Sequence, residues 1–539
     1  MIETEDFTKK QEEILQKYVS NTSSNIFVLK NLPEVIKGAL FSRYSRSSLS
    51  LKTLLLKDFI LNDEVNFEEI DQNINGENDQ YIAIQKAQTF YDRILDGYGD
   101  DSIGELGGAH LAIENVSIIA AKVIEDSRIG GSPLEKSTRY ICFDKKVNGE
   151  YLFYKEPILM TSAYKKLYLE TCNLLFDTYA NLIPPMTKLM KETFPKEENI
   201  SDVAYRAALR AKVLDCLRGL LPASTLTNLG VFGNGRFYES LIRKMSTHNL
   251  TEMQDIAKDA YTELYKVIPS FIRRTNQSSK NQISYNNFID QTRKNLKILS
   301  DEHSKFLDEQ TSAGIHLINS DPDAVYKVVA ALLFEHNQKD LHSFQKYAKN
   351  LSNEEILRIF EATAAARENR RHKSPRALEN AVFTFEMVAD FGIYRDLQRH
   401  RMLTQERQLL TSDYGYYTPK EIIGTEMEKD YENAIKAAKK AYDQISTELK
   451  EEAQYVVPMA YNLHWYFTIN LRSLQWLSEI RSAPAGHPNY RFVAQEMAKQ
   501  VFSKFPQFEC FFKFVDFEGY DLGRMGQEIK RVEKTKIKL

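Results

Sequence analysis

Apolar residues recur at strand spacing in one segment of each half of this chain. Residues 110–116 and residues 382–388 are alternating or continuous apolar runs, and both favour β-strands. A helical period replaces this spacing in residues 213–221 and in residues 435–449. The pattern predicts that each half contains a strand core together with long helices.

The two halves also align with each other at fixed offsets. Asp100–Ser102 aligns with His372–Ser374, and Glu114 aligns with Glu386, in both cases at an offset of 272 (372 − 100 and 386 − 114). A constant offset over separate segments is the signature of an internal repeat.

A second block repeats at a different offset. Arg218–Pro222 aligns with Gln454–Pro458, and Asn234–Arg236 aligns with Asn470–Arg472, both at an offset of 236 (454 − 218 and 470 − 234). The offsets differ by 36 (272 − 236), so the first half carries extra residues between its two blocks. We interpret the chain as a diverged tandem repeat. Two unrelated domains with accidental matches are the alternative.

The expected fold class is α/β (α+β), with two diverged units fused in tandem. We expect an N-terminal unit over residues 1–275, a linker or helical connector over 276–315 and a C-terminal unit over 316–539. The polar, non-periodic segment 273–282 marks the start of the connector, and a helix is expected around 296–307.

Composition places few further limits on the protein. A chain of 539 residues is expected to form two or more domains, and its 43% hydrophobic and 27% charged residues are typical of a soluble globular enzyme. The net charge of −3 favours neither nucleic acid nor a membrane surface as a partner. Four scattered cysteines predict neither a disulfide framework nor a metal site. The acidic N-terminus lacks a signal-peptide layout, which predicts a cytoplasmic protein.

An Arg399-His400-Arg401 cluster follows the strand-like run of the second half. Neighbouring arginines repel one another, so a fold that packs them closely usually supplies anions, and guanidinium groups bind phosphate or an anionic heterocycle in bidentate fashion. A solvated basic turn would explain an isolated cluster. The preceding apolar run 389–397 makes a surface turn less favourable here.

The first half contains a different polar segment, Glu135-Lys136-Ser137-Thr138-Arg139-Tyr140. It follows a Gly-Gly-Ser-Pro run at 130–133 that can present backbone donors to an anion. Arginine with a neighbouring hydroxyl could bind phosphate, although a loop held by ion pairs would look the same. The repeated Asn-x-Arg segments, 234–236 and 470–472, could bind a nucleotide or cap helices. Dinucleotide-binding, phosphate-loop and zinc-protease motifs are absent from the sequence.

These residues resemble the flavin-dependent thymidylate synthase (ThyX) family. Its signature has Arg-His-Arg, then Ser after seven intervening residues, within a run ending Asn-Glu-x-Ser-x-Arg-Tyr. Later blocks are Arg-x-Val-Leu-Pro, Asn-x-Arg-Ser-Leu and Leu-x-x-Arg. The resemblance covers residues 35–270 and 320–539. The second half supplies His372–Pro375, Arg399–Arg401, Asn470–Leu474 and Arg481. The first half supplies Glu135–Tyr140, Arg218–Pro222 and Asn234–Arg236.

Each half departs from the signature where the other keeps it. In the second half, Leu409 stands where the signature has Ser, and Gln454 replaces the arginine of the proline block. In the first half, Asp100 takes the place of the flavin-contacting histidine and Ser127-Arg128-Ile129 that of Arg-His-Arg. Thr138 stands where the family commonly has glycine. The resemblance therefore implies that the first half keeps the nucleotide loop, Glu135–Tyr140, and that the second half keeps the flavin cluster, Arg399–Arg401.

The resemblance implies a reductive methylation in which dUMP becomes dTMP. FAD is the implied cofactor, and NADPH and methylenetetrahydrofolate are the implied co-substrates. The implied catalytic residues are Arg399, Arg481 and Ser137, with Ser137 acting as a binding hydroxyl rather than as a nucleophile. The implied substrate-binding residues are Glu135, Ser137, Thr138, Arg139, Arg218, Arg399 and Arg481. The implied cofactor-binding residues are His372, Ser374, Arg399, His400, Arg401, Asn470, Arg472, Asn234 and Arg236.

The same resemblance implies an assembly, because family members resemble homotetramers with sites built at subunit interfaces. A homodimer of this fused chain would rebuild such a tetramer with two competent sites instead of four. Two other functions stay open at this point. One is a catalytically inactive protein that binds nucleotide or flavin, and the other is a flavoenzyme that modifies another pyrimidine nucleotide.

Overall fold

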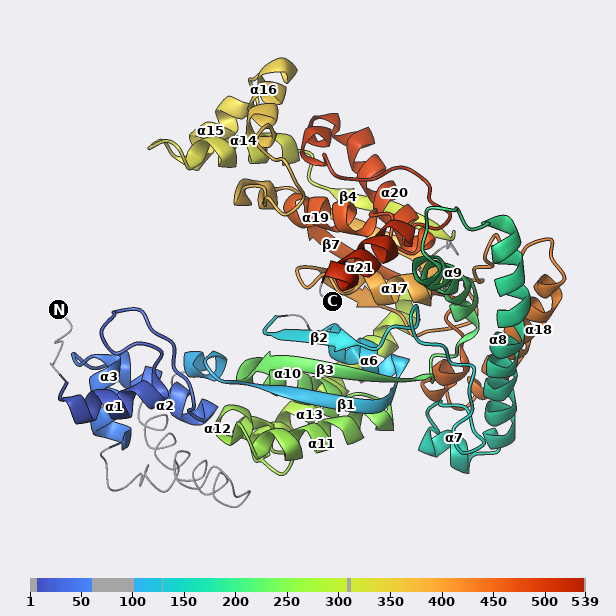
Figure 1. Ribbon diagram of the computed structural model, residues 1–539, viewed down its shortest axis with the longest axis horizontal. Coiled ribbons are helices and arrows are strands. Elements are labelled where there is room, and N and C mark those ends of the chain that lie inside the picture. Colours follow the sequence, from blue (N-terminus) through green and yellow to red (C-terminus); the bar gives the residue numbers. More distant parts are fainter. Residues whose placement is uncertain (1–6, 61–100, 128, 308–311, 538–539) are drawn as a thin grey trace. The chain divides into compact units, whose positions relative to one another are not determined.

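The computed structural model describes residues 7–60, 101–127, 129–307 and 312–537 (Figure 1). Asp100 and Arg128, which the alignment of the halves includes, lie outside these residues. The chain forms two compact units. Unit 1 comprises Met1–Glu114, Ser127–Glu135 and Asn228–Leu307, and unit 2 comprises Asn115–Asp126, Lys136–Thr227 and Asp308–Leu539. Unit 2 thus combines segments from both halves of the sequence, and the boundaries expected at 275 and 315 stay a prediction.

Unit 1 is built on a three-stranded sheet in the order β1-β3-β2. The strands are β1 (Gly108–Ser117), β2 (Gly131–Glu135) and β3 (Leu226–Asn234), the last residues of β1 and the first of β3 being counted with unit 2. Strands β2 and β3 are antiparallel, with Glu135 opposite Leu229. The α-helices are α1 (Lys9–Tyr18), α2 (Glu34–Tyr44), α3 (Leu51–Leu54), α10 (Gly235–Ser246), α11 (Thr251–Tyr265), α12 (Pro269–Ile272) and α13 (Lys280–His303). Short helical turns are η1 (Leu55–Ile60), η2 (Asp101–Glu105), η4 (Arg273–Thr275) and η5 (Ser304–Phe306).

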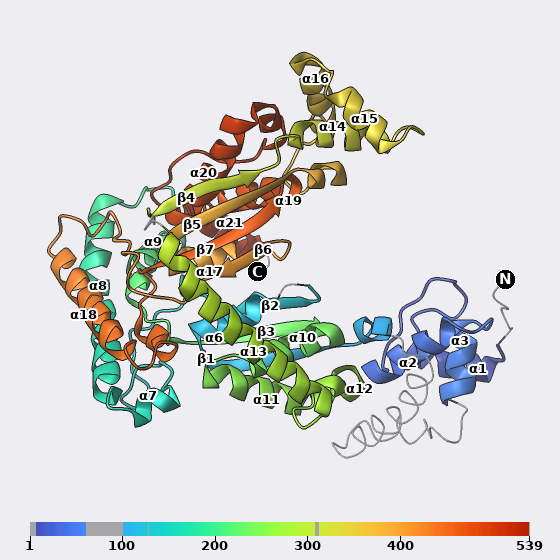
Figure 2. The ribbon, with the colours of Figure 1, turned by 180° about the vertical axis from the view of Figure 1, so that it is seen from behind.

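Unit 2 contains a four-stranded antiparallel sheet in the order β4-β5-β7-β6 (Figure 2). Its strands are β4 (Gly314–Ser320), β5 (Val382–Asp390), β6 (Thr404–Arg407) and β7 (Asn462–Asn470). Phe383, Phe385 and Met387 of β5 are fully buried, which explains the alternating pattern of this run. Helices α19 (Leu471–Arg481) and α20 (Pro488–Lys504) pack against strands of this sheet.

The remaining helices of unit 2 come from both halves. The first half contributes α6 (Ile118–Glu125), α7 (Pro157–Thr161), α8 (Lys165–Thr193), α9 (Asp202–Leu217) and the turn η3 (Arg218–Leu220). The second half contributes α14 (Ala324–Phe334), α15 (Leu341–Ala348), α16 (Asn353–Ala364), α17 (Phe391–Leu397), α18 (Met427–Ile445) and α21 (Met525–Ile537), with the turns η6 (Arg376–Asn380), η7 (Glu452–Val456) and η8 (Pro506–Phe511). Helix α8 packs along α18, so the halves share one core. No helix of the described ranges is long and apolar enough to span a bilayer.

The tandem repeat is confirmed at the start of α6 and α17. Ser117 caps α6 and Asp390 caps α17 through the side chain, and each helix starts directly after a strand. The amides of Ile118 and Phe391 donate hydrogen bonds to the carbonyls of Thr225 and Tyr461, respectively, and these two acceptors are related by the offset of 236 (461 − 225). The offset between Ile118 and Phe391 is 273 (391 − 118), so the alignment of 127–129 with Arg-His-Arg is shifted by a single position at this junction.

Equivalent residues of the two halves pair with each other. Pro222 and Pro458 form an antiparallel bridge. The amide of Ala223 donates to the carbonyl of Val457 at 2.8 Å, and that of Met459 donates to Leu221 at 3.0 Å. Adding 236 to Ala223 and Leu221 gives Met459 and Val457, so the two bonds are reciprocal. In a symmetric dimer, two subunits make reciprocal contacts of this isologous kind. Here the two halves of one chain make such a contact.

The predicted elements are confirmed for the most part. Strands 110–116 and 382–388 correspond to β1 and β5, and the helix ending at 221 is α9 with η3. The helix expected around 296–307 is the end of the longer α13, which already begins at Lys280 within the segment expected to be non-periodic. Its N-cap is Ser279, which accepts a hydrogen bond from the amide of Gln282. The α/β fold class of tandem units is confirmed.

Candidate functional site

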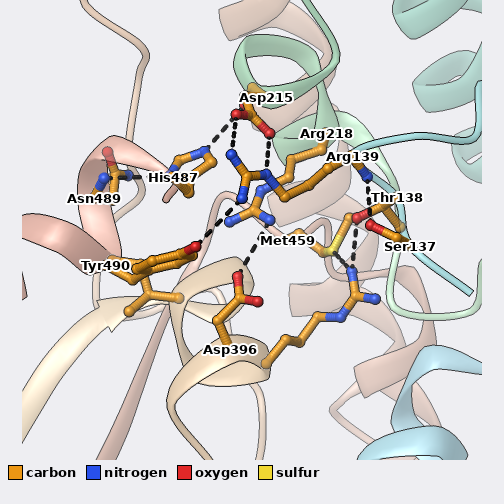
Figure 3. A network of polar contacts seen from close by, with 12 residues as sticks. Ser137, Thr138, Arg139, Asp215, Arg218, Asp396, Met459, His487, Asn489 and Tyr490 are labelled. Atoms are coloured by element: carbon orange, nitrogen blue, oxygen red, sulfur yellow. Dashed lines mark hydrogen bonds and ion pairs between the residues drawn. The ribbon is translucent and has the colours of Figure 1, made fainter. Parts of the chain in front are cut away.

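Arg139 of the predicted nucleotide loop lies in a buried ion pair of unit 2 (Figure 3). Its Nε and Nη2 donate to the two carboxylate oxygens of Asp215 on α9, both at 2.6 Å, and its Nη1 donates to the Tyr490 hydroxyl at 3.3 Å. Burial acts to raise the pKa of Asp215, but the charge and hydrogen bonds of Arg139 outweigh burial and lower it. The bidentate pair fixes Arg139 in one orientation.

Arg218 and Asp396 form a second pair in the same network (Figure 3). Arg218 Nη1 lies 3.5 Å from an oxygen of Asp396, which is a long contact for charged partners. Arg218 is buried, and its Nη2 has no hydrogen-bond partner among the residues described here. Burial opposes ionisation of Asp396, yet its pKa is strongly lowered by the charges of four arginines, Arg218, Arg481, Arg139 and Arg399. Asp396 of the second half thus marks the point on which guanidinium groups from both halves converge.

The hydroxyls of the nucleotide loop are placed by the same network. The Ser137 hydroxyl accepts a hydrogen bond from the backbone amide of Arg139 at 3.3 Å, and the buried Thr138 hydroxyl accepts from Arg395 Nη1 at 3.3 Å. Arg395 belongs to α17 of the second half, four residues before Arg399. Thr138 is therefore a direct contact between the nucleotide loop and α17, the helix that precedes the Arg-His-Arg cluster.

Arg399 is held by a carboxylate of the first half. Its Nη2 lies 3.3 Å from Oε1 of Glu125, the last residue of α6, while Lys122 and Gln398 bind the other oxygen of Glu125. Glu125 and Lys122 are almost fully buried. A buried carboxylate with three polar partners is a rigid support for the arginine side chain.

Six of the residues predicted to bind the cofactor line one cleft of about 610 Å³ in unit 2, namely His372, Ser374, Arg399, His400, Arg401 and Arg472. Arg367, Arg370, Arg371, Lys373 and Trp476 also line it. We call it the flavin cleft, after the cofactor that the sequence resemblance implies for these residues. No carboxylate is among its described lining residues, so the cleft suits a ligand with several negative charges. Arg472 is fixed at its edge, because its Nε donates to the Ser374 carbonyl at 2.7 Å and its Nη1 pairs with Glu379 at 2.9 Å.

His400 is uncharged at neutral pH. Burial and the neighbouring Arg481 lower its pKa to about 3, and its Nε2 accepts a hydrogen bond from Arg481 Nε at 3.1 Å. His487 is likewise neutral, since burial and Arg218 lower its pKa to about 3. Arg481 lies over the Tyr490 ring, 5.6 Å from the ring centre. Arg481 therefore connects the flavin cleft to the Arg139 network, which Tyr490 also contacts.

Three of the predicted site residues, Glu135, Asn234 and Arg236, belong to unit 1 and not to unit 2. The side chain of Asn234 caps α10 by accepting from the amide of Phe237 at 2.9 Å, and that of Asn470 caps α19 in the same way. Both asparagines thus adopt the capping role that the sequence left open. Arg236 lies 3.7 Å from Glu105, and Glu135 ends β2.

The cysteines show no sign of nucleophilic chemistry. All four are free, and Cys172 and Cys216 are buried. Burial raises the pKa of Cys172 to about 12 and that of Cys216 well above its usual range. In the part of the chain that the structure describes, no group of three or more acidic, histidine or cysteine side chains could hold a metal ion.

Sequence reasoning missed the acidic and aromatic partners of the arginines. They are Glu125, Asp215, Asp396 and Tyr490, together with Arg395 and His487. His487 followed by Pro488 was a readable helix start, and the structure places His487 as the N-cap of α20. The carboxylates lie on helices of ordinary appearance, and nothing in their local sequence marks their partners.

Comparison with known proteins finds one family model that matches both halves and relatives that match nearly the whole chain. A family model described as thymidylate synthase complementing protein matches two segments, residues 60–270 and 316–507. A UPF0159 protein of Chlamydia pneumoniae is 52% identical over 532 residues, covering 98% of this chain and 99% of the relative. UPF0159 proteins of Chlamydia muridarum and Thermoplasma acidophilum are 51% and 33% identical, each over 526 residues, covering 98% and 93% of this chain and 98% and 99% of the relatives.

Proposed function

The chain belongs to the thymidylate synthase complementing protein family, and on this premise we propose that it is a flavin-dependent thymidylate synthase. It would make dTMP from dUMP with methylenetetrahydrofolate and NADPH, through bound FAD. The site would be composite, with the first half supplying the nucleotide loop and the second half supplying the flavin cluster.

The observation that carries the proposal is the contact between these two groups within unit 2. Thr138 contacts Arg395, Arg218 pairs with Asp396, and Glu125 pairs with Arg399. Each contact joins a residue of the first half to a residue of α17 or the cluster after it. The nucleotide loop and the flavin cleft therefore adjoin, as hydride or carbon transfer between a flavin and a nucleotide requires.

On the nucleotide side, the arginine network suits a phosphate monoester. Arg218 has a buried Nη2 without a described hydrogen-bond partner and only a long contact to Asp396, so it can take up a further anion. Arg139 is already oriented by Asp215, and its Nη1 donates a hydrogen bond to the Tyr490 hydroxyl. A phosphate would replace Asp396 as the anion at the centre of the arginines, and Ser137 would donate a hydrogen bond to it.

On the flavin side, the residues present fit FAD. Arg370, Arg371 and Lys373 offer cations for a pyrophosphate, and the indole of Trp476 offers a partly exposed ring. When bound, FAD supplies the hydride that reduces the one-carbon unit, after reduction by NADPH. Arg399, held by Glu125, and Arg481 would stabilise negative charge on the pyrimidine or the ring system. Because its Nε2 accepts from Arg481, neutral His400 can donate a hydrogen bond from Nδ1 there without adding charge.

Thr138 favours a second candidate function, a flavoenzyme acting on another pyrimidine nucleotide. It stands where the family commonly has glycine, and its larger side chain changes the shape offered to the pyrimidine of dUMP. Product analysis separates the two functions, since only the first yields dTMP.

The test is an anaerobic reaction of the purified, FAD-loaded protein with dUMP, methylenetetrahydrofolate and NADPH. If the proposal is correct, dTMP forms as NADPH is oxidised, and bound FAD makes the protein yellow. Oxidation of NADPH without dTMP would favour the second candidate. A protein that takes up no FAD would contradict both. The family resemblance further supports a homodimer of this fused chain, which light scattering would report as about 125 kDa, twice the 62.4 kDa chain mass.

A further inference from the structure

A second and larger cleft of unit 2 is formed beside the C-terminal helix α21. Its volume is about 1430 Å³. It is lined by Tyr140, Arg370, residues 483–485, and residues of the segment 523–535. We call it the α21 cleft. The roles assigned above to the nucleotide loop and the flavin cleft use only Tyr140 and Arg370 of these residues.

The charge of the α21 cleft is strongly positive. Arg370, Lys530, Arg531 and Lys534 line it, and all four are exposed. Glu528 is the single carboxylate among its described lining residues, and it is buried with an oxygen 3.2 Å from Arg531. The cleft therefore presents an excess of cations to a ligand.

Arg524 provides an independent observation next to this cleft, because it packs against the lining residue Tyr140. It is 7% exposed, and its guanidinium lies 4.1 Å from the centre of the Tyr140 ring and donates to the Tyr140 hydroxyl. Its Nε and Nη1 are buried without a hydrogen-bond partner in the described residues. A buried guanidinium with two unsatisfied donors is costly unless an anion completes it.

The α21 cleft adjoins both parts of the site. Arg370 lines the α21 cleft and the flavin cleft alike. Tyr140 lines the α21 cleft and directly follows Arg139 of the nucleotide loop. A ligand whose reactive end lies in the flavin cleft could therefore extend a flexible anionic tail past Arg370 into the α21 cleft.

We propose that the α21 cleft binds the glutamyl tail of the folate co-substrate, an inference that rests on the proposed function. Cellular folates carry several γ-linked glutamates, and each adds one carboxylate on a flexible chain. Lys530 and Lys534 stand one helical turn apart on α21, so they can bind successive carboxylates of an extended tail. The phosphates of NADPH share the anionic chemistry, but two exposed lysines one helical turn apart match separate carboxylates along a flexible chain better than they match one compact phosphate.

The experiment compares two folates by isothermal titration calorimetry with the FAD-loaded protein. The probes are tetrahydrofolate with one glutamate and tetrahydrofolate with five. We expect the pentaglutamate to bind at least tenfold more tightly than the monoglutamate. In the double variant Lys530→Gln/Lys534→Gln this advantage should fall to threefold or less, with the affinity for monoglutamate unchanged within twofold. Both lysines are exposed, so the variant should keep the wild-type unfolding temperature.

A matched control is Lys436→Gln/Lys440→Gln. These lysines are exposed, have the same spacing on α18, and line neither cleft. The control should keep the full advantage of the pentaglutamate. Because exposed charges are screened by salt, the advantage of the wild type should also shrink between 50 mM and 500 mM NaCl.

The outcomes of these titrations distinguish failure of the proposed tail site from failure of the proposed function. Equal affinity for both folates in the wild type would overturn the tail site and leave the synthase function standing. A double variant that weakens NADPH binding and not pentaglutamate binding would assign the cleft to NADPH and overturn the inference as well. If the protein binds neither folate, the proposed function itself fails.

Discussion

Arg399 Nη2 lies 3.3 Å from Oε1 of Glu125, so an arginine of the second half has its counter-ion in the first half. Glu125 is also the partner of buried Lys122. One carboxylate therefore supports both the Arg-His-Arg cluster and the packing of α6. This arrangement explains how the halves of a repeat could specialise. Once each half depends on the other for orientation of its functional side chains, neither can form the site alone.

Glu125→Gln should lower both stability and flavin affinity. The substitution keeps an oxygen acceptor but removes the charge opposite Lys122 and Arg399, leaving buried Lys122 without a counter-ion. We expect the free energy of unfolding to fall by about 1–3 kcal/mol and the Kd for FAD to rise, as measured by urea denaturation and fluorescence titration. Glu114→Gln, at an exposed position, is the control and should change neither. A Glu125→Gln protein with wild-type stability would contradict the supporting role.

Arg139→Lys should weaken nucleotide binding despite conserving charge. A lysine cannot make the two parallel hydrogen bonds to Asp215 or reach Tyr490 at the same time. We expect the Kd for dUMP to rise about 10–100-fold, since each tenfold step corresponds to about 1.4 kcal/mol. Equilibrium dialysis measures it. Arg210→Lys, exposed on α9, should bind dUMP as the wild type does, and an unchanged Kd in Arg139→Lys would remove Arg139 from the nucleotide site.

Asp396→Asn should strengthen the binding of nucleoside monophosphates. The substitution removes the negative charge that a phosphate has to replace beside Arg218, while it keeps the size of the side chain. The same change leaves the arginines without their shared anion, so the free protein should be less stable. We expect tighter binding of dUMP together with a lower unfolding temperature in the absence of nucleotide. Weaker binding of dUMP would show that Asp396 contacts the nucleotide favourably instead.

The stability of the protein should fall as the pH drops below about 6.5. Burial lowers the pKa of His400 and of His487 to about 3 in the folded chain. The unfolded chain protonates both near pH 6.5, so between these values it binds more protons than the folded chain does. The free energy of unfolding is therefore lost at up to about 1.4 kcal/mol per pH unit for each histidine. Urea denaturation at pH 7.5, 6.5 and 5.5 measures the slope.

His487→Gln should reduce this slope, whereas His303→Gln, exposed at the end of α13, should not. The carboxyl groups with a lowered pKa change the free energy of unfolding only at lower pH. The stability contributed by Asp215 and Asp396 is lost only as the pH falls below about 3.8, their ordinary value, toward their folded pKa. A free energy of unfolding that stays constant from pH 7.5 to 5.5 would contradict the account of the buried histidines.

The sequence predicted those features that depend on short segments. Alternation identified β5, helical spacing identified α18, and the repeat offsets paired Asn234 with Asn470, which the structure places as equivalent helix caps. It also predicted that His372, Arg399 and Arg472 belong together, which the flavin cleft supports. These features follow from local period and from residue types that recur at fixed spacing.

What the sequence could not predict depends on long-range pairing. Asp215, Asp396 and Glu125 find their arginines only when α9, α17 and α6 pack together. The reciprocal hydrogen bonds around Pro222 and Pro458 likewise arise from the packing of one half on the other. The early start of α13 was readable from Ser279 followed three residues later by Gln282, but the polar composition of the segment outweighed it.

The central claim is that both halves of one chain supply a single site. The most direct measurement is dTMP formation by Arg139→Ala, by Arg399→Ala and by an equimolar mixture of the two, beside the wild type. Because Thr138 of the nucleotide loop contacts Arg395 of the same chain, we expect each variant to lose activity and the mixture to stay inactive while the wild type forms dTMP. Wild-type rates in either variant, or recovery of activity on mixing, would contradict the claim.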